Sequence, residues 1–94
     1  GMTMAKFKLS KPYTMPKEEV RQAAEGLAAN LERDHGVRSR WDGDCVRIKG
    51  AGVDGELSFH DGLIDVSVKL GMLASMFERP LRDEVQRYLD THIT

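Results

Sequence analysis

The sequence has few of the residues that build disulfide frameworks and reactive centres. Its 94 residues include one cysteine, Cys45, and three histidines. A single cysteine excludes an internal disulfide and suits a reducing compartment. No apolar run approaches the roughly 18 residues that a membrane-spanning helix needs, and the start of the chain lacks the pattern of a signal peptide. We therefore expect a cytoplasmic protein without a membrane span.

The chain also lacks an excess of charge. Fourteen Lys and Arg residues against fifteen Asp and Glu residues give a net charge of −1, so no protein-wide field attracts nucleic acid or an anionic membrane. We expect residues 2–94 to form one small domain, with Gly1 a remnant of a cleaved tag. A homodimer interface would add to the small core that such a length allows.

The first half of the chain changes from a period of two to a helical period. Residues 4–10 alternate between polar and apolar, which predicts a half-buried strand. Thr14 is predicted to cap a helix with Pro16 in its first turn, and Gly36 to end that helix in the left-handed conformation. The apolar stripe of this helix comprises Val20, Ala23, Ala24, Leu27, Ala28 and Leu31.

From Val37 the period of two returns, interrupted by turns at 42–44, 50–52 and 61–62. A two-residue Asp61-Gly62 loop pairs Phe59 with Ile64, Leu57 with Val66 and Val53 with Leu70. This register puts all the apolar residues on one face of the sheet. After it we predict a short apolar turn at 72–77 and a helix from about residue 79, the alternative being one helix kinked at Pro80. The stripe of this last helix comprises Leu81, Val85, Tyr88, Leu89 and His92.

These elements predict an α+β fold in the order β-α-β-β-β-β-α. Each strand has one apolar face, so the sheet needs a cover on one side only, and we expect both helices to pack on that face. The first strand is expected beside the fifth, in an antiparallel sheet, with a place beside the second strand as the alternative.

Residues 50–55 match the G-x-G-x-x-G string of dinucleotide-binding proteins. That motif requires a helix directly after the glycines, so that its N-terminus meets the pyrophosphate. Here Glu56 to Phe59 alternate as a strand does, so we interpret the glycines as turn residues.

One predicted hairpin carries four cations on its outward face, Arg38, Arg40, Arg47 and Lys49. Facing like charges are unfavourable, so these residues form either an anion-binding surface or part of a charge ladder. In the ladder, Asp54 pairs with Lys49 and can also meet Lys69, while Glu56 pairs with Arg47. Aromatic residues that could stack on bases are absent from this surface, which makes nucleic acid an improbable partner.

No catalytic, cofactor or metal site is expected. His35, His60 and His92 lie far from one another and from Cys45 in the sequence, without metal-ligand spacing. No serine or cysteine has a recognisable activating neighbour. We expect the chain not to be an enzyme.

Four large apolar side chains, Met72, Leu73, Met76 and Phe77, follow the last strand closely. Methionine and phenylalanine suit adaptable contacts, so this segment is a candidate docking surface for a partner, a second copy or an apolar particle. The alternative is a plug that closes one end of the core.

Several short segments, taken together, resemble the polyhydroxyalkanoic acid system family, whose members are bacterial proteins of about this length described as granule-associated or granule-regulatory. The resemblance implies association with storage-polyester granules and supplies no catalytic residue. The segments are Trp41-Asp42-Gly43-Asp44, Gly52-Val53-Asp54-Gly55, Leu70-Gly71-Met72-Leu73, Glu84-Val85 and Tyr88-Leu89.

Residues and resemblance together indicate a non-enzymatic accessory or regulatory protein that contacts a protein or a polyester granule, with Trp41 as a further contact residue if it is exposed. One alternative is a helix-grip-like module that holds a lipid or acyl ligand in a cavity beneath Trp41 and the final helix. The other is a binder of anions or nucleic acid through the cationic hairpin.

Overall fold

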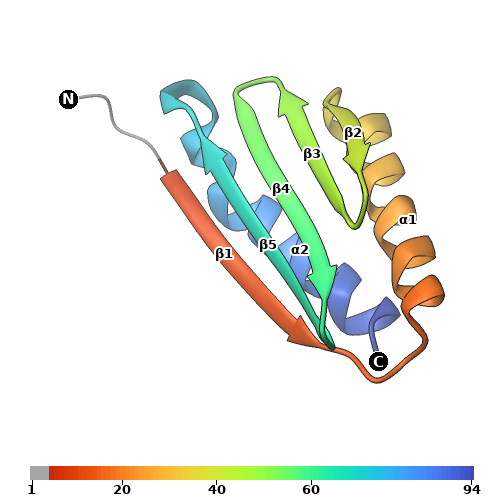
Figure 1. The fold of residues 1–94 in the computed structure, drawn as a ribbon. Helices are drawn as coiled ribbons and strands as arrows, with labels where there is room; N and C mark the ends of the chain where they lie inside the picture. The colour runs from red at the N-terminus through yellow and green to blue at the C-terminus, as the bar shows by residue number, and fades with distance from the viewer. Residues whose placement is uncertain (1–4) are drawn as a thin grey trace.

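The computed structural model describes residues 5–94, and the elements follow the predicted order (Figure 1). Gly1, interpreted above as a tag remnant, and Met4, the predicted start of the first strand, lie outside the described residues. In chain order the elements are β1 (Ala5–Pro12), α1 (Lys17–His35), β2 (Arg38–Asp42), β3 (Cys45–Gly50), β4 (Val53–His60), β5 (Leu63–Leu70), the 3₁₀ helix η1 (Met72–Phe77) and α2 (Glu78–His92).

The five strands form one antiparallel sheet in the order β1-β5-β4-β3-β2. The predicted place of the first strand beside the fifth is therefore confirmed. The predicted register is confirmed as well, since Phe59 pairs with Ile64, Leu57 with Val66 and Val53 with Leu70. The turn residues set the alignment, so the buried apolar side chains of the strands reach the same face, whereas Leu63, at the start of β5, lies on the opposite face.

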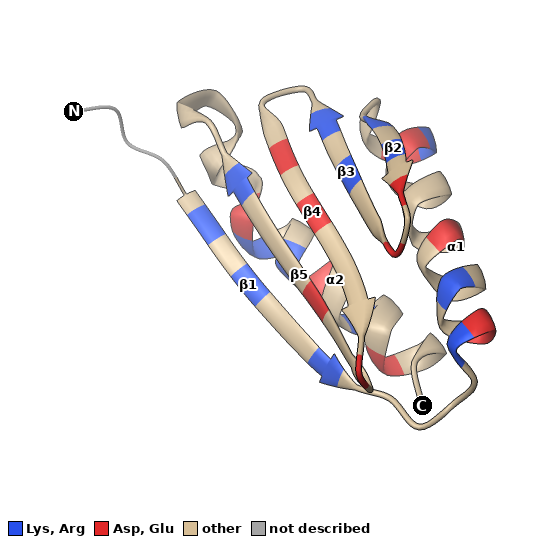
Figure 2. Cartoon of the chain, viewed as in Figure 1, with Lys and Arg blue, Asp and Glu red and all other residues tan. Residues whose placement is uncertain are grey.

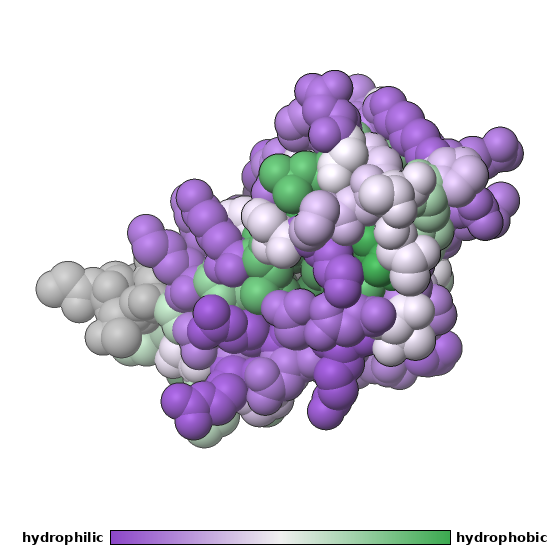
Figure 3. All heavy atoms as spheres, turned by 90° about the horizontal axis from the view of Figure 1, so that it is seen from below, coloured by the Kyte–Doolittle hydropathy of each residue, from purple (hydrophilic) through white to green (hydrophobic). Residues whose placement is uncertain are grey.

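Both helices cover that single face, as predicted (Figure 1). Buried and exposed residues alternate along β4 and β5, and the core lies between the inner sheet face and the two helices. Phe59, Leu57 and Ile64 are among its largest fully buried side chains. Most charged residues of the strands alternate with the buried ones and so belong to the opposite face; their positions along the strands are coloured in Figure 2. Seen from below, the surface is mostly hydrophilic, with apolar atoms visible near its centre (Figure 3).

Helix α1 begins differently from the prediction and ends as predicted. Thr14 does not cap it; its hydroxyl donates a hydrogen bond to the carbonyl of Thr94 at 2.9 Å. Pro16 occupies the position before the helix instead of its first turn. The Thr14 prediction was wrong because a residue from the far end of the chain competes for the hydroxyl. Gly36 ends α1 with φ of 69°, in the left-handed conformation.

The segment after β5 forms η1 and then α2, so the predicted break before Pro80 is confirmed. Leu81, Val85 and Leu89 bury the inner face of α2. The inclusion of His92 in this stripe was wrong: its side chain is exposed and its ring lies 4.1 Å from that of Tyr88, centre to centre. Ile93, one residue past the helix, is buried instead. No helix among residues 5–94 is long and apolar enough to cross a membrane.

The two helices meet closely at Gly26 of α1. The hydroxyl of Tyr88 donates a hydrogen bond to the carbonyl of Ala23 at 2.8 Å, and a Cβ atom at position 26 would lie 2.5 Å from that hydroxyl oxygen. The helices converge toward the start of α1 and the end of α2, and they diverge toward the other end (Figure 1). Glycine at position 26 therefore permits the contact at which the helices approach each other.

We expect Gly26→Ala to lower the free energy of unfolding by about 1 kcal/mol. Alanine in a helix interior is favourable by about 1 kcal/mol, but the crowded Tyr88 hydroxyl would lose its hydrogen bond and its packing, at about 1–3 kcal/mol. Urea denaturation of a double-mutant cycle with Tyr88→Phe measures the effect. In the phenylalanine background the alanine should be neutral or stabilising. Stabilisation by Gly26→Ala in the wild-type background would contradict the contact.

Candidate functional site: an apolar pocket beside an exposed apolar helix

The 3₁₀ helix η1 presents four large apolar side chains to solvent. The exposed fraction is 55% for Met72, 89% for Leu73, 75% for Met76 and 57% for Phe77. We call these four residues the η1 surface. Among the large apolar residues of 5–94, the only other exposed one is Leu63, at 37%. Four exposed large apolar side chains within six residues are of the kind that soluble proteins use for contacts.

Small residues hold η1 against the sheet. Ala74 is buried, and a Cβ atom on Gly52 would lie 3.1 Å from its methyl group. The amide of Gly71 donates a hydrogen bond to the carbonyl of Gly52 at 2.9 Å. Ala74 thus closes this end of the core, as the plug alternative assumed. The four larger side chains of the segment stay largely outside the core.

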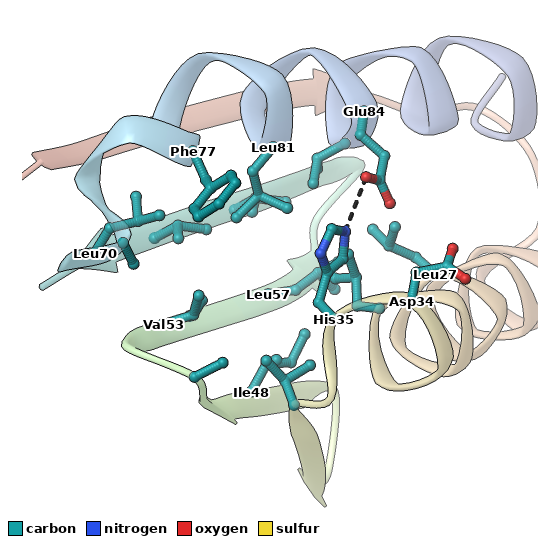
Figure 4. Close-up of a pocket in the computed structure, with 18 of the residues that line it drawn as sticks. Leu27, Asp34, His35, Ile48, Val53, Leu57, Leu70, Phe77, Leu81 and Glu84 are labelled. Carbon is teal, nitrogen blue, oxygen red and sulfur yellow. Dashed lines mark hydrogen bonds and ion pairs between the residues drawn. The ribbon is translucent and has the colours of Figure 1, made fainter.

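Next to η1 lies an apolar pocket of about 360 Å³ between the inner sheet face and the diverging helices (Figure 4). Phe77 and Leu81 line it from the η1 and α2 side, and Leu27 from α1. The sheet contributes Ile48, Val53, Leu57, Val66, Val68 and Leu70. This size is within the range of small-molecule sites.

Gly55 forms part of the sheet side of this pocket. It is buried within β4, opposite Ile48 on β3 and Val68 on β5. A Cβ atom there would meet Val68 at 3.5 Å, an ordinary contact, and its φ is not positive. The interpretation of all the glycines in 50–55 as turn residues was therefore wrong for Gly55, although Gly50 and Gly52 do lie in a turn that leads into a strand. Its missing side chain leaves volume in the core.

A polar link joins the two helices at the edge of the pocket. The Nε2 atom of His35, the last residue of α1, lies 3.0 Å from Oε1 of Glu84 on α2 (Figure 4). Both side chains line the pocket, as does Asp34. The hydrogen-bonded guanidinium of Arg33 lowers the pKa of the Asp34 carboxyl. Sequence spacing could not reveal the pair, because 49 residues separate its members.

The pocket does not lie beneath Trp41, as the ligand-module alternative assumed. Trp41 is half-buried, with its ring edge toward Phe59 at 6.4 Å between ring centres. The guanidinium carbon of Arg21 lies 4.6 Å from the centre of the Trp41 ring. Since Arg21 and Phe59 contact this ring, Trp41 is poorly placed for a partner, and the space is at the other end of α1.

The comparisons with known proteins agree with this chain's short motifs. The model of the family described as "putative polyhydroxyalkanoic acid system protein" matches residues 7–93. The chain belongs to this family. Neither curated proteins nor solved structures gave a match. The resemblance inferred from the glycine turns and the last helix is therefore confirmed.

The cationic hairpin of this family member is partly neutralised. Arg38 faces Lys49 and Arg40 faces Arg47, as predicted. The guanidinium of Arg47 lies 3.2 Å from Glu56 and 3.5 Å from Asp54, and the ammonium of Lys49 lies 4.0 Å from Asp54. Lys69 is opposite Asp54 in the sheet but forms no ion pair with it among the described residues. The charge ladder thus forms at Arg47 and Lys49, while Arg38 and Arg40 make no ion pair within residues 5–94.

Cys45 lies at the start of β3, half-buried on the charged face. Its thiol donates a hydrogen bond to Oε1 of Glu56 at 3.4 Å. Burial, the hydrogen bond to Glu56 and the charge of that carboxylate raise the pKa of the thiol. Across residues 5–94, no three His, Cys, Asp or Glu side chains are grouped as metal ligands would be.

We expect Glu56→Gln to make Cys45 more reactive. The raised pKa keeps the thiol protonated at mildly alkaline pH, and only the thiolate is nucleophilic. Removing the carboxylate charge lowers the pKa, so the rate of alkylation by iodoacetamide at pH 8 should rise a few-fold and its pH profile should shift to lower pH. Asp54→Asn, which also removes a carboxylate near Arg47, is the matched control. Identical profiles for wild type and Glu56→Gln would contradict the assignment.

Proposed function

We propose that this chain is a non-enzymatic accessory protein of the polyhydroxyalkanoate system that acts by contact between its η1 surface and the surface of a storage-polyester granule. Membership of the family links the chain to the polyhydroxyalkanoate system. The exposed side chains of Met72, Leu73, Met76 and Phe77 are available for the contact. The single observation that carries the proposal is the 89% exposure of Leu73 within a well-formed element. A polyester surface presents ester and alkyl groups, to which such side chains adhere by loss of apolar area from water.

The shape of η1 supports contact with an extended surface. Its buried residue is Ala74, so the turn keeps its place without its larger side chains. Burial of these exposed side chains against another surface therefore does not require the core to unfold. Methionine, with its flexible thioether chain, adapts to irregular apolar surfaces.

The absence of obvious reactive groups supports the non-enzymatic part of the proposal. Among residues 5–94, no polar or charged residue is buried. The His35–Glu84 pair lies at the edge of an apolar pocket, and no serine, threonine or cysteine lines that pocket. An activated nucleophile normally needs such a hydroxyl or thiol beside its base.

The proposal places the protein in the bacterial cytoplasm at the granules. Co-sedimentation with purified granules tests it, using Leu73→Asp/Met76→Asp. Neither residue lines the pocket, and both are exposed, so folding should change by no more than about 0.5 kcal/mol per site. Burying two carboxylates against polyester is unfavourable, so we expect the bound fraction to fall at least about tenfold.

Gln22→Asp/Ala29→Asp is the matched control, because it adds the same charge at exposed positions of α1. It should sediment with the granules as the wild type does. Equal binding of the Leu73→Asp/Met76→Asp variant would refute the proposal. Binding only to granules that retain their protein coat would point to a protein partner, and a dimer that this variant dissociates would make the η1 surface a subunit interface.

A further inference from the structure

We propose that the pocket between the sheet and the diverging helices binds an uncharged aliphatic hydroxy ester, with its alkyl chain against Gly55 and its hydroxyl or ester group at the His35–Glu84 pair. The pocket itself carries this inference; it rests on the proposed function only for the source of such an ester, which the repeating unit of a polyhydroxyalkanoate resembles. The pocket and the η1 surface are separate sites that share Phe77.

The size and walls of the pocket suit one short alkyl chain. At about 360 Å³ it has room for roughly a dozen atoms of carbon and oxygen, if each needs about the 30 Å³ that a water molecule occupies. Its walls are mainly Leu, Ile, Val and Phe side chains, which offer no hydrogen bond to water. A cavity with such walls favours apolar occupants over water.

Gly55 leaves the sheet side of this space without a side chain. Its neighbours across the sheet, Ile48 and Val68, both carry branched side chains on the inner face. A Cβ atom would fit there at 3.5 Å from Val68, so neither backbone conformation nor crowding demands glycine. The alkyl chain of a ligand can occupy the volume that a side chain would fill.

The titratable residues at the edge of the pocket favour an uncharged ligand. Its titratable lining residues are Asp34, His35, Glu56 and Glu84, and neither Lys nor Arg lines it. The Glu56 side chain pairs with Arg47 on the outer sheet face, which leaves two carboxylates and an imidazole at the edge. The carboxylate of a free fatty acid would gain no guanidinium or ammonium partner from the lining and would meet the like charge of Glu84, while the charge of Asp34 is paired with that of Arg33. An uncharged group has no such cost.

The His35–Glu84 pair can hold a hydroxyl group. The carboxylate of Glu84 accepts hydrogen bonds, and a ring nitrogen of His35 can donate one. The two groups already share one hydrogen bond at 3.0 Å, and a hydroxyl at the edge of the pocket can donate to a remaining lone pair of the Glu84 carboxylate. Phe77, which is 57% exposed and also lines the pocket, connects this site with the η1 surface, so a chain can enter from a surface on which η1 lies.

The test is calorimetric titration of the full chain with methyl 3-hydroxybutyrate, methyl 3-hydroxyhexanoate and methyl 3-hydroxyoctanoate. We expect one ligand per chain for the octanoate ester. Each methylene buried should raise the affinity about fourfold, hence roughly fifteenfold for each step of two methylenes in the series. The 3-hydroxyoctanoate anion should bind at least about tenfold more weakly than its methyl ester, because its charge faces Glu84 and no Lys or Arg lines the pocket.

Gly55→Val should weaken binding of the octanoate ester at least about tenfold, since its side chain fills the sheet side of the pocket. Ser58→Val is the matched control, because it enlarges a residue on the outer face of the same strand and should leave affinity unchanged. If circular dichroism shows that Gly55→Val is unfolded, Val53→Phe replaces it as the filling variant, since Val53 also lines the pocket.

Three results would overturn the inference: no saturable binding of methyl 3-hydroxyoctanoate, unchanged affinity in a folded filling variant, or binding of the anion as tight as that of the ester. The Leu73→Asp/Met76→Asp variant separates the two proposals. It should bind the ester as the wild type does, whatever its behaviour with granules. Granule binding without ester binding would remove the pocket ligand and leave the proposed function standing.

Discussion

A sheet whose one apolar face is covered by α1, α2 and the short η1 is the constraint on which this structure depends. The strands deliver their buried apolar side chains to the same side, and burial of that side from water is the main driving force for folding. The helices meet closely at Gly26 and Tyr88 and diverge from there. Where they separate, the sheet is covered by side chains that bridge the gap, and a pocket remains beneath them.

The two candidate sites follow from this incomplete cover. The pocket occupies the gap between the helices, and η1 closes the remaining end of the sheet with Ala74 while its larger side chains point outward. Covering the sheet with short elements therefore leaves apolar area both inside and outside the molecule. The outer sheet face does not share this character, because charge pairs such as Arg47 with Glu56 cover it, and exposed pairs of this kind add little stability.

Local patterns predicted the elements well because they act over a few residues. The alternation of polar and apolar residues predicted the strands, and the apolar stripe from Val20 to Leu31 predicted α1. The Asp61-Gly62 turn predicted the register of β4 and β5. The errors at Thr14 and His92 both lie near a helix end and have different causes. Thr94, from the far end of the chain, binds Thr14, whereas Ile93, the residue just past the end of α2, takes the buried place expected for His92.

The sequence by itself determined that the sheet is one-sided, where its turns lie and which six-residue segment carries excess apolar side chains. Only the tertiary structure decided that Gly55 faces an unfilled space and that His35 meets Glu84 across 49 residues. The physical reason is that periodicity fixes which face of an element is apolar, but not the angle at which two helices cross it. Here Tyr88 packs against Gly26 where the helices meet, and the pocket lies where they have separated.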